Sequence, residues 1–478
     1  MGTSRRSAPS LASAALASSL STLFATTPLL AQQEPAWVEQ AVAARPAARS
    51  GHAMVFQPTN GKVLMFGGEL TSTALSSEIW EFTPFQPTSP VPPQGSWASR
   101  TVSPRPSARR GHAMVWDDVR NVAVLFGGHA GGAAMNDETW EWNGSTWSQK
   151  APAAHPTGRF QHAMAYDSVR HRVVLFGGRD AGGNDLADTW EYDGATWIPR
   201  FVPAFPEPRS RHAMAYDAAR GVVVLFGGTA LTTSTWEYEG TTWTPRIVPY
   251  APAPRRGATL AFDSTRATTV LFGGELNLEW NDTWEWDGAA WRQRATALPL
   301  PLPRDGAGMA YDSLRGRTVL FGGESYGSKR DDTWEYYFPS GYTTFGAGCL
   351  GSMGLATLGT ELTVPALLGS SLAVAIMNVP TNTLVAMITG FSRDEWNGAP
   401  LPVSLAALGM PGCELYVSTD VLEPLVAAGN VANYTIQLPA APLFLGFVFH
   451  QQALVFDAAS GNPFAAIMSN AGTVVIGN

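Results

Sequence analysis

Residues 173–197 read VVLFGGRDAGGNDLADTWEYDGATW, and this stretch decides the fold because its pattern recurs along the chain. An apolar run ends on two glycines, a loop follows, and Trp-Glu-Tyr leads through Asp-Gly to another tryptophan. The apolar run is typical of a buried strand, and Asp193-Gly194 supplies the positive φ angles of a two-residue hairpin. The stretch therefore predicts consecutive antiparallel strands, the last of which opens at Trp197.

The pattern occurs six times, at intervals of 46 to 60 residues between successive Phe-Gly-Gly strings. With one short strand before each apolar run, every repeat contains four antiparallel strands, which is the content of one blade of a β-propeller. The strings begin at Phe66, Phe126, Phe176, Phe226, Phe272 and Phe321.

The repeats resemble the kelch family over about residues 37–338. A double glycine ends the second strand, an aromatic pair such as Trp140 and Trp142 lies on the third, and a tryptophan such as Trp147 opens the fourth. The resemblance implies an all-β fold with a six-bladed kelch-type propeller of the galactose oxidase/kelch-like superfamily, since kelch repeats of ~50 residues form propellers.

The two ends of the repeat region predict how the ring closes. Trp37 stands 15 positions before His52, the same spacing that separates Trp97 from His112, so it opens a fourth strand without the first three. The sixth repeat has no tryptophan strand after Phe338. We therefore expect the N-terminal strand at Trp37 to pair with the strand around Trp334 and complete the sixth blade.

The sequence outside the repeats predicts two further segments. Residues 1–31 have a basic start at Arg5-Arg6, an apolar stretch and a small residue at Ala31, which is typical of a secretory signal peptide; the paired arginines also fit a twin-arginine signal. Residues 32–340 would form the propeller, and residues 341–478 a C-terminal β-sandwich-like domain. The protein is expected to be exported, to the periplasm, the cell surface or the medium.

The C-terminal segment differs in composition from the repeats. It holds one basic residue, seven acidic residues and many short apolar runs. The only two cysteines of the chain, Cys349 and Cys413, lie here, and in an exported protein a disulfide between them is expected. Residues 345–352 and Pro411-Gly412-Cys413 resemble a C-terminal module of secreted planctomycete-type bacterial proteins.

Composition and motifs exclude several classes of function. The net charge of −8 opposes general binding of nucleic acid, and no segment after the N-terminus has ~18 uninterrupted apolar residues, so no transmembrane helix is expected. No P-loop, GxSxG, HExxH or EF-hand string occurs. Neither a cofactor nor a metal site is predicted.

One face of the predicted propeller combines variable loops with a repeated arginine, and loops on a rigid scaffold often carry binding. In kelch-like adaptors of ubiquitin ligases, arginines at this motif position hold acidic peptides, although here they could instead pair with carboxylates of the protein. Three glutamates and Arg179 follow glycine pairs on the same face. The ligand-binding candidates are Arg49, Arg109, Arg159, Arg209, Arg255, Arg304, Arg179, Glu69, Glu275 and Glu324.

Four histidines occupy one position in successive repeats and are interpreted as structural. Packed sheets lie ~10 Å apart while a metal needs ligands ~2 Å away, so equivalent positions cannot easily converge on one ion. We expect these side chains to form hydrogen bonds between blades. They are His52, His112, His162 and His212.

Two hypotheses for function follow. The first is an exported binding protein that recognises a glycan or an extracellular protein or peptide, with an acidic ligand favoured near Arg109, Arg159, Arg209 and Arg179. The second is a carbohydrate-active kelch-type enzyme that resembles the sialic-acid epimerases. Copper oxidase chemistry of the galactose oxidase kind is not expected, because residues 32–340 lack the cysteine needed for the cross-linked tyrosine.

Overall fold

The computed structural model describes residues 34–42, 44–84, 95–132, 135–294, 296, 298–338, 341–360 and 366–477. The expected signal peptide, residues 1–31, lies outside this range. The described chain separates into two compact units, residues 34–338 and residues 341–477, and each is described here by itself. In the described ranges, no helix has the length and apolar character needed to span a membrane.

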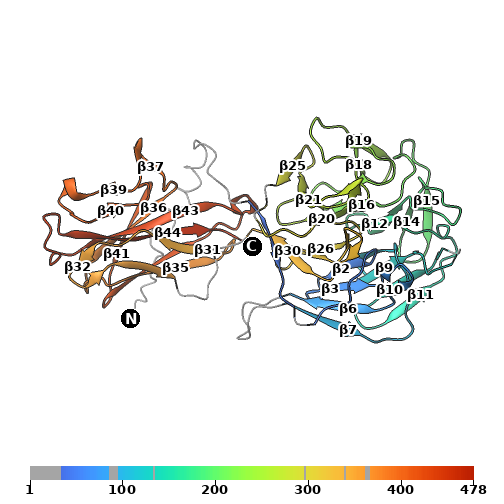
Figure 1. Ribbon diagram of the computed structural model, residues 1–478, viewed down its shortest axis with the longest axis horizontal. Coiled ribbons are helices and arrows are strands. Elements are labelled where there is room, and N and C mark those ends of the chain that lie inside the picture. Colours follow the sequence, from blue (N-terminus) through green and yellow to red (C-terminus); the bar gives the residue numbers. More distant parts are fainter. Residues whose placement is uncertain are drawn as a thin grey trace, which may run out of the picture. The chain divides into compact units, whose positions relative to one another are not determined.

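The first unit consists of six four-stranded antiparallel sheets, which Figure 1 shows arranged in a ring with the first strand of each sheet toward the centre. The sheets are numbered as blades along the chain. Blade 1 has β2 (Ala53–Gln57), β3 (Lys62–Phe66), β6 (Ile79–Thr83) and β7 (Ser96–Arg100); blade 2 has β8 (Ala113–Asp117), β9 (Val122–Phe126), β10 (Thr139–Trp142) and β11 (Trp147–Lys150); blade 3 has β12 (Ala163–Asp167), β13 (Arg172–Phe176), β14 (Thr189–Tyr192) and β15 (Trp197–Arg200).

The remaining blades repeat this order, and the last takes its outer strand from the N-terminus. Blade 4 has β16 (His212–Asp217), β17 (Val222–Gly227), β18 (Thr235–Tyr238) and β19 (Trp243–Arg246); blade 5 has β20 (Thr259–Asp263), β21 (Thr268–Phe272), β24 (Thr283–Trp286) and β25 (Trp291–Arg294); blade 6 has β26 (Gly308–Asp312), β27 (Arg317–Phe321), β30 (Thr333–Tyr337) and β1 (Ala36–Glu39).

The predicted closure is confirmed. Strand β1 pairs antiparallel with β30, and Trp37 lies opposite Tyr336. The Trp37 ring packs at 4.9 Å from the ring of Phe272 in blade 5, and its Nε1 donates to Oγ1 of Thr283 at 2.9 Å. The two ends of the repeat region therefore share one blade, and the predicted fold class of a six-bladed kelch-type propeller holds.

The hydrophobic core of the propeller lies between neighbouring blades. One cluster joins Val55, Leu64 and Phe66 of blade 1 to Leu125 and Trp147 of blade 2, and equivalent clusters follow around the ring. The second strands are apolar on both faces because each lies between two sheets, which explains their unbroken runs of Val, Leu and Phe.

The tryptophan that opens each fourth strand connects its blade to the one before. Its indole N–H donates to the hydroxyl of a threonine at the start of the preceding blade's third strand in five of six cases, at 2.8–3.0 Å. Blade 1 carries Ile79 at that position, and within the described residues the indole N–H of Trp147 has no partner. One sequence difference thus removes one hydrogen bond.

The second unit is a β-sandwich, as predicted. Residues Leu372, Val374 and Ile376 alternate inward along β35 and share one core with Val385 and Met387 of β36. The larger sheet has the order β31 (Gly341–Phe345), β44 (Ala466–Val475), β43 (Val448–Phe456), β36 (Leu384–Gly390) and β41 (Val421–Val426); the smaller has β34 (Thr357–Thr360), β35 (Ser371–Met377) and β42 (Val431–Gln437).

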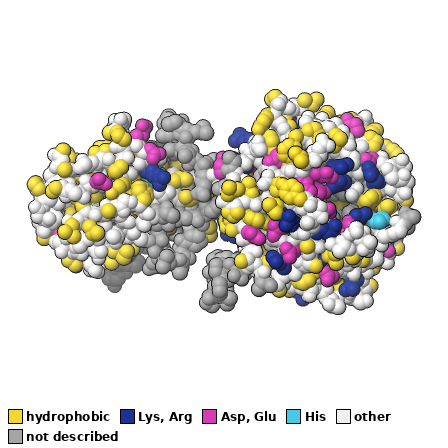
Figure 2. Space-filling view, in the orientation of Figure 1, with side chains coloured by type: hydrophobic (Ala, Val, Ile, Leu, Met, Phe, Trp, Pro, Cys, Tyr) yellow, Lys and Arg dark blue, Asp and Glu magenta, His cyan; other side chains and the backbone are white. Residues whose placement is uncertain are grey.

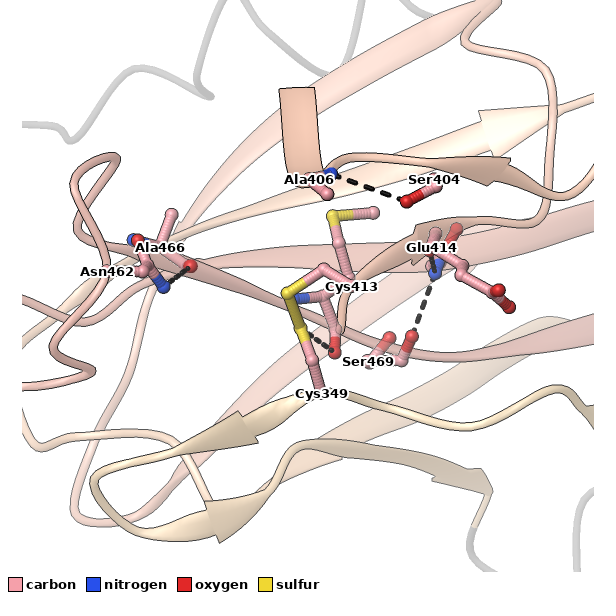
Figure 3. Close-up of a disulfide and its surroundings, with 10 residues drawn as sticks. Cys349, Ser404, Ala406, Cys413, Glu414, Asn462, Ala466 and Ser469 are labelled. Carbon is pink, nitrogen blue, oxygen red and sulfur yellow. Dashed lines mark hydrogen bonds between the residues drawn. A yellow bond between two sulfur atoms is a disulfide. The ribbon is translucent and has the colours of Figure 1, made fainter. Parts of the chain in front are cut away.

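The expected disulfide is present in this unit. Cys349 and Cys413 are bonded through their sulfur atoms and are buried in the sandwich core (Figure 3). The Sγ atom of Cys349 also accepts a hydrogen bond from the backbone N–H of Met468 in β44, at 2.9 Å. The bridge therefore ties the segment that precedes the smaller sheet to the turn before Glu414.

Candidate binding site at the channel mouth

The six repeated arginines are part of the scaffold. Each is at most 1% exposed, and one of its terminal nitrogens donates to the carbonyl of the first glycine of its own blade's pair, at 2.8–3.0 Å. A carboxylate neutralises each guanidinium. The pairs are Arg49–Glu78, Arg109–Glu138, Arg159–Asp188, Arg209–Glu207, Arg255–Asp282 and Arg304–Asp332.

Of the two alternatives that the sequence left open, the structure shows pairing with carboxylates of the protein, and these six arginines do not line the pocket at the channel mouth. Arg49, Arg109, Arg159, Arg209, Arg255 and Arg304 are hereafter the scaffold arginines. Their carbonyl groups also join the blades: the N–H of Gly68 donates to the carbonyl of Arg109 at 2.9 Å. A Cβ atom on Gly67 would lie 2.8 Å from that oxygen, so only glycine permits the approach.

Two residues after each scaffold arginine, the backbone forms a closed ring around the propeller axis. The N–H of each ring residue donates to the carbonyl of its counterpart in the preceding blade, at 2.6–2.9 Å, including the bond from Gly51 to Gly306 that joins blades 1 and 6. We call these residues the collar. They are Gly51, Gly111, Gln161, Arg211, Gly257 and Gly306.

All six collar residues have the left-handed backbone conformation, with φ from +57° to +68°. Four are glycine, which adopts it without penalty, while Gln161 and Arg211 bear side chains at a cost of roughly 1 kcal/mol each. The fold does not require these two side chains, because glycine fills the same position in the other blades. Strain that the fold does not need points to a functional constraint.

The collar surrounds a pocket of about 400 Å³, the mouth pocket, on the propeller axis. The first strands of all six blades contribute to its wall, and Gln161 and Arg211 are both part of its lining. The size falls within the 300–1,000 Å³ range of small-ligand pockets. Other polar or aromatic lining residues are Ser50, Glu69, Arg110, Phe160, Thr259, Asp305, Glu324 and the four repeat histidines, His52, His112, His162 and His212.

Much of the charge at the mouth is internally paired. Arg211 contacts Glu275 at 2.8 Å and also Asp305, while Arg256 contacts Glu275 at 2.9 Å. Glu69 pairs with Arg110 and lies 3.6 Å from Lys329. Figure 2 shows basic and acidic side chains interspersed over the visible face of the propeller unit.

The surroundings of Asp305 shift the pKa of its carboxyl group far from the usual value. Burial raises the pKa of Asp305 to about 6, the contact with Arg211 opposes this shift, and the charges of Glu275 and Glu324 add to it. The group therefore exchanges a proton within two pH units of neutrality, beside an arginine, in the wall of the mouth pocket.

The other predicted candidates lie on this face and are paired. Glu275 contacts Arg211 and Arg256, Glu324 lies 3.4 Å from Lys329, and Glu69 contacts Arg110. Arg179 is bonded to Asp185 of its own loop at 2.8 Å, and it does not line the mouth pocket. An electropositive sector built from Arg109, Arg159, Arg209 and Arg179, as expected from the sequence, is therefore not formed.

The four histidines lie between blades, where each packs against a phenylalanine ring and interacts weakly with the backbone of the same phenylalanine. Each ring meets a phenylalanine of the preceding blade edge-on, with centroids 5.5–5.6 Å apart. No ring nitrogen makes a well-formed hydrogen bond within the described chain. Burial, with a contribution from the nearby scaffold arginine, lowers the pKa of three of them to about 3, so they stay neutral: His52, His112 and His212.

Sequence reasoning named Glu69 and Glu324, which line the mouth pocket, but it missed four other lining residues. Arg110 and Phe160 directly follow scaffold arginines, while Gln161 and Arg211 come one position later. The signal was present, because these positions differ among repeats that are otherwise alike. Over the described ranges, no three His, Cys, Asp or Glu side chains are grouped to hold a metal ion.

A comparison with protein families agrees with the fold. The family model "Attractin/LZTR1 beta-propeller" matches residues 31–253. A solved structure titled "Structure of YjhT" is similar with a TM-score of 0.49 and 12% identity, over 61% of this chain and 95% of that chain. No curated protein matches the chain. The family match and the six four-stranded sheets show a kelch-like propeller.

Proposed function

We propose that this protein is an exported binding module whose ligand, a glycan or a segment of an extracellular protein, enters the mouth pocket. The pattern of variation within the chain carries the proposal. Residues common to all blades, such as the scaffold arginines, are accounted for by the fold, whereas Arg110, Phe160, Gln161 and Arg211 occupy two positions that vary among the blades, and they line the pocket. Such variation on a rigid frame is typical of a binding surface.

Export is supported by two features of the chain. The N-terminal sequence has the pattern of a signal peptide, and the disulfide between Cys349 and Cys413 suits an oxidising compartment.

A second candidate is a carbohydrate-active enzyme on the same propeller. One observation favours it: Asp305 combines a pKa of about 6 with a place in the pocket wall beside Arg211. A carboxyl group of this kind can donate or accept a proton near neutral pH. Incubation of the protein with the sugars it binds, followed by NMR of the anomeric protons, separates turnover from binding.

The binding proposal is tested by obstructing the pocket. In the variant Gly306→Gln, the new Cβ atom has no neighbour closer than 3.6 Å, and φ is +62°, close to the value that Gln161 already tolerates. The matched control is Gly144→Gln in the β10–β11 hairpin, where φ is +93° and no atom lies within 4 Å of the added Cβ.

Both variants and the wild type would be applied to a glycan array and a panel of extracellular proteins. We expect Gly306→Gln to weaken binding of the wild-type ligand at least tenfold and Gly144→Gln to leave it within twofold. Equal binding by all three proteins would place the ligand outside the mouth pocket and refute the proposal.

A further inference from the structure

We propose that the ligand is an uncharged sugar, with one face of its ring on Phe160 and its hydroxyl groups bonded to the amide of Gln161. This inference rests on the proposed function and names the ligand of the same pocket. It follows from a division of the pocket wall into two parts. The charged part consists of Glu69, Arg110, Arg211, Asp305 and Glu324, and the neutral part consists of Phe160 and Gln161.

The arginines of the charged part already form ion pairs with carboxylates of the protein. Arg211 is held by Glu275 and Asp305, and Arg110 is held by Glu69, which also lies near Lys329. An anionic ligand would have to displace these carboxylates, and it would meet Glu324 as well. A cationic ligand would have to compete with the arginines for the same carboxylates. A charged ligand would therefore gain few new ion pairs in this pocket, because the protein's own side chains already form them.

The neutral part has polar groups that are free to bind a ligand. Phe160 is half-buried, lines the pocket and packs at 5.7 Å from the ring of His129. Gln161 is half-buried beside it, and within the described chain its side-chain amide makes no hydrogen bond to the protein. Together they place an aromatic ring in the pocket wall beside an amide with two donor hydrogens and one acceptor oxygen.

Sugars match this pair of groups. A pyranose has apolar C–H groups on its faces, which pack on an aromatic ring, and hydroxyl groups around its edge, which bond to an amide as donors and acceptors. The volume of about 400 Å³ suits one or two sugar residues. At the position of Phe160, blades 1 and 4 have serine, blades 2 and 5 have arginine and blade 6 has aspartate. At the position of Gln161, four blades have glycine and blade 4 has Arg211. Both open groups are thus specific to blade 3.

Residues found at the equivalent positions of other blades are suitable substitutions in blade 3, because the same fold already contains them there. Phe160→Ser gives blade 3 the residue of blades 1 and 4, and Gln161→Gly gives it the collar residue of four other blades. The matched control is Phe201→Ser, which makes the same change of side chain at a residue that is 96% exposed and does not line the pocket.

Binding of cellobiose, lactose, chitobiose, mannobiose and digalacturonate to the full exported chain would be measured by calorimetry. We expect at least one neutral disaccharide to bind, with affinity reduced at least tenfold in Phe160→Ser and at least fivefold in Gln161→Gly. Phe201→Ser should remain within twofold of the wild type, and thermal unfolding should show all three variants folded.

The outcomes separate this inference from the proposal beneath it. If Gly306→Gln abolishes binding of a ligand while Phe160→Ser and Gln161→Gly retain it, the mouth binds but the sugar assignment is wrong. Tighter binding of digalacturonate than of every neutral sugar, or binding of proteins alone at the mouth, also overturns the sugar assignment. Binding that none of these variants affects overturns both.

Discussion

The residue opposite the indole of Trp147 determines whether this tryptophan forms a hydrogen bond to the preceding blade. Five equivalent tryptophans donate to a threonine hydroxyl of the preceding blade, whereas Ile79 leaves Trp147 without such a group in the described structure. A buried donor without a partner costs about 1–3 kcal/mol.

This difference predicts an unusual order of stability. Ile79→Val and Ile79→Thr remove the same volume, but only threonine provides an acceptor for the Trp147 N–H. We expect the threonine variant to be more stable than the valine variant by about 1 kcal/mol, measured by urea unfolding. Valine at least as stable as threonine, the usual order at a buried site, would contradict this geometry.

The buried histidines predict a dependence of stability on pH. His52, His112 and His212 have pKa values of about 3 when folded, against 6.5 in the unfolded chain, so between these values the unfolded state binds more protons. The free energy of unfolding therefore falls as the pH drops below 6.5, by up to about 1.4 kcal/mol per pH unit for each histidine.

The variant His112→Ala tests this dependence, since blades 5 and 6 have Ala258 and Ala307 at the equivalent position. We expect the variant to be less stable at pH 7, because packing against Phe66 is lost. Its unfolding free energy should also fall less steeply between pH 6 and 4, by about 1 kcal/mol per pH unit. Parallel pH profiles for variant and wild type would show that His112 is protonated in the folded state.

At this scale the sequence predicted which residues recur but not where their side chains lie. The sequence left two alternatives open for the scaffold arginines, which were a ligand site at the mouth and pairing with carboxylates of the protein. Their partner carboxylates lie far along the chain: Glu138 pairs with Arg109 and Asp188 pairs with Arg159. Each of these two carboxylates comes 29 positions after its arginine and just before the third strand. That pairing depends on how the loop after the glycine pair folds back, which strand periodicity does not determine.

At the scale of elements, β1 is the strand on which the ring depends. It supplies the outer edge of blade 6 and buries Trp37 against Phe272 and Tyr336. Spacing predicted this strand and its partner, because the tryptophan and histidine positions hold a fixed distance across the repeats. The collar could not be predicted in the same way, since it requires left-handed backbone and contacts between blades.

Removal of residues 34–41 tests the role of β1. We expect the free energy of unfolding to fall by more than the 3–5 kcal/mol typical of a single buried Trp→Ala change, because the paired edge of β30 is lost as well. A synthetic peptide of residues 34–42 should restore stability by strand addition, and the same peptide with Trp37→Ala should not. A truncated chain as stable as the intact one would contradict the closure.

At the scale of the whole molecule, the disulfide stabilises one unit and not the other. It closes a loop of 64 residues within the sandwich, for which loop entropy predicts about 4 kcal/mol of stabilisation. In calorimetry, we expect Cys349→Ala/Cys413→Ala to lower the unfolding temperature of the C-terminal unit while the propeller transition stays in place. Displacement of both transitions together would show that the two units unfold as one.

The central claim of this account is that the ligand lies in the mouth pocket, against residues that differ from blade to blade. The most direct test is a crystal structure of the protein with the tightest ligand from the glycan array and the protein panel. The account predicts density inside the collar, with a ligand atom within hydrogen-bond distance of the Gln161 amide. Density on the outer strands or on the C-terminal unit, with the mouth pocket unoccupied, would contradict it.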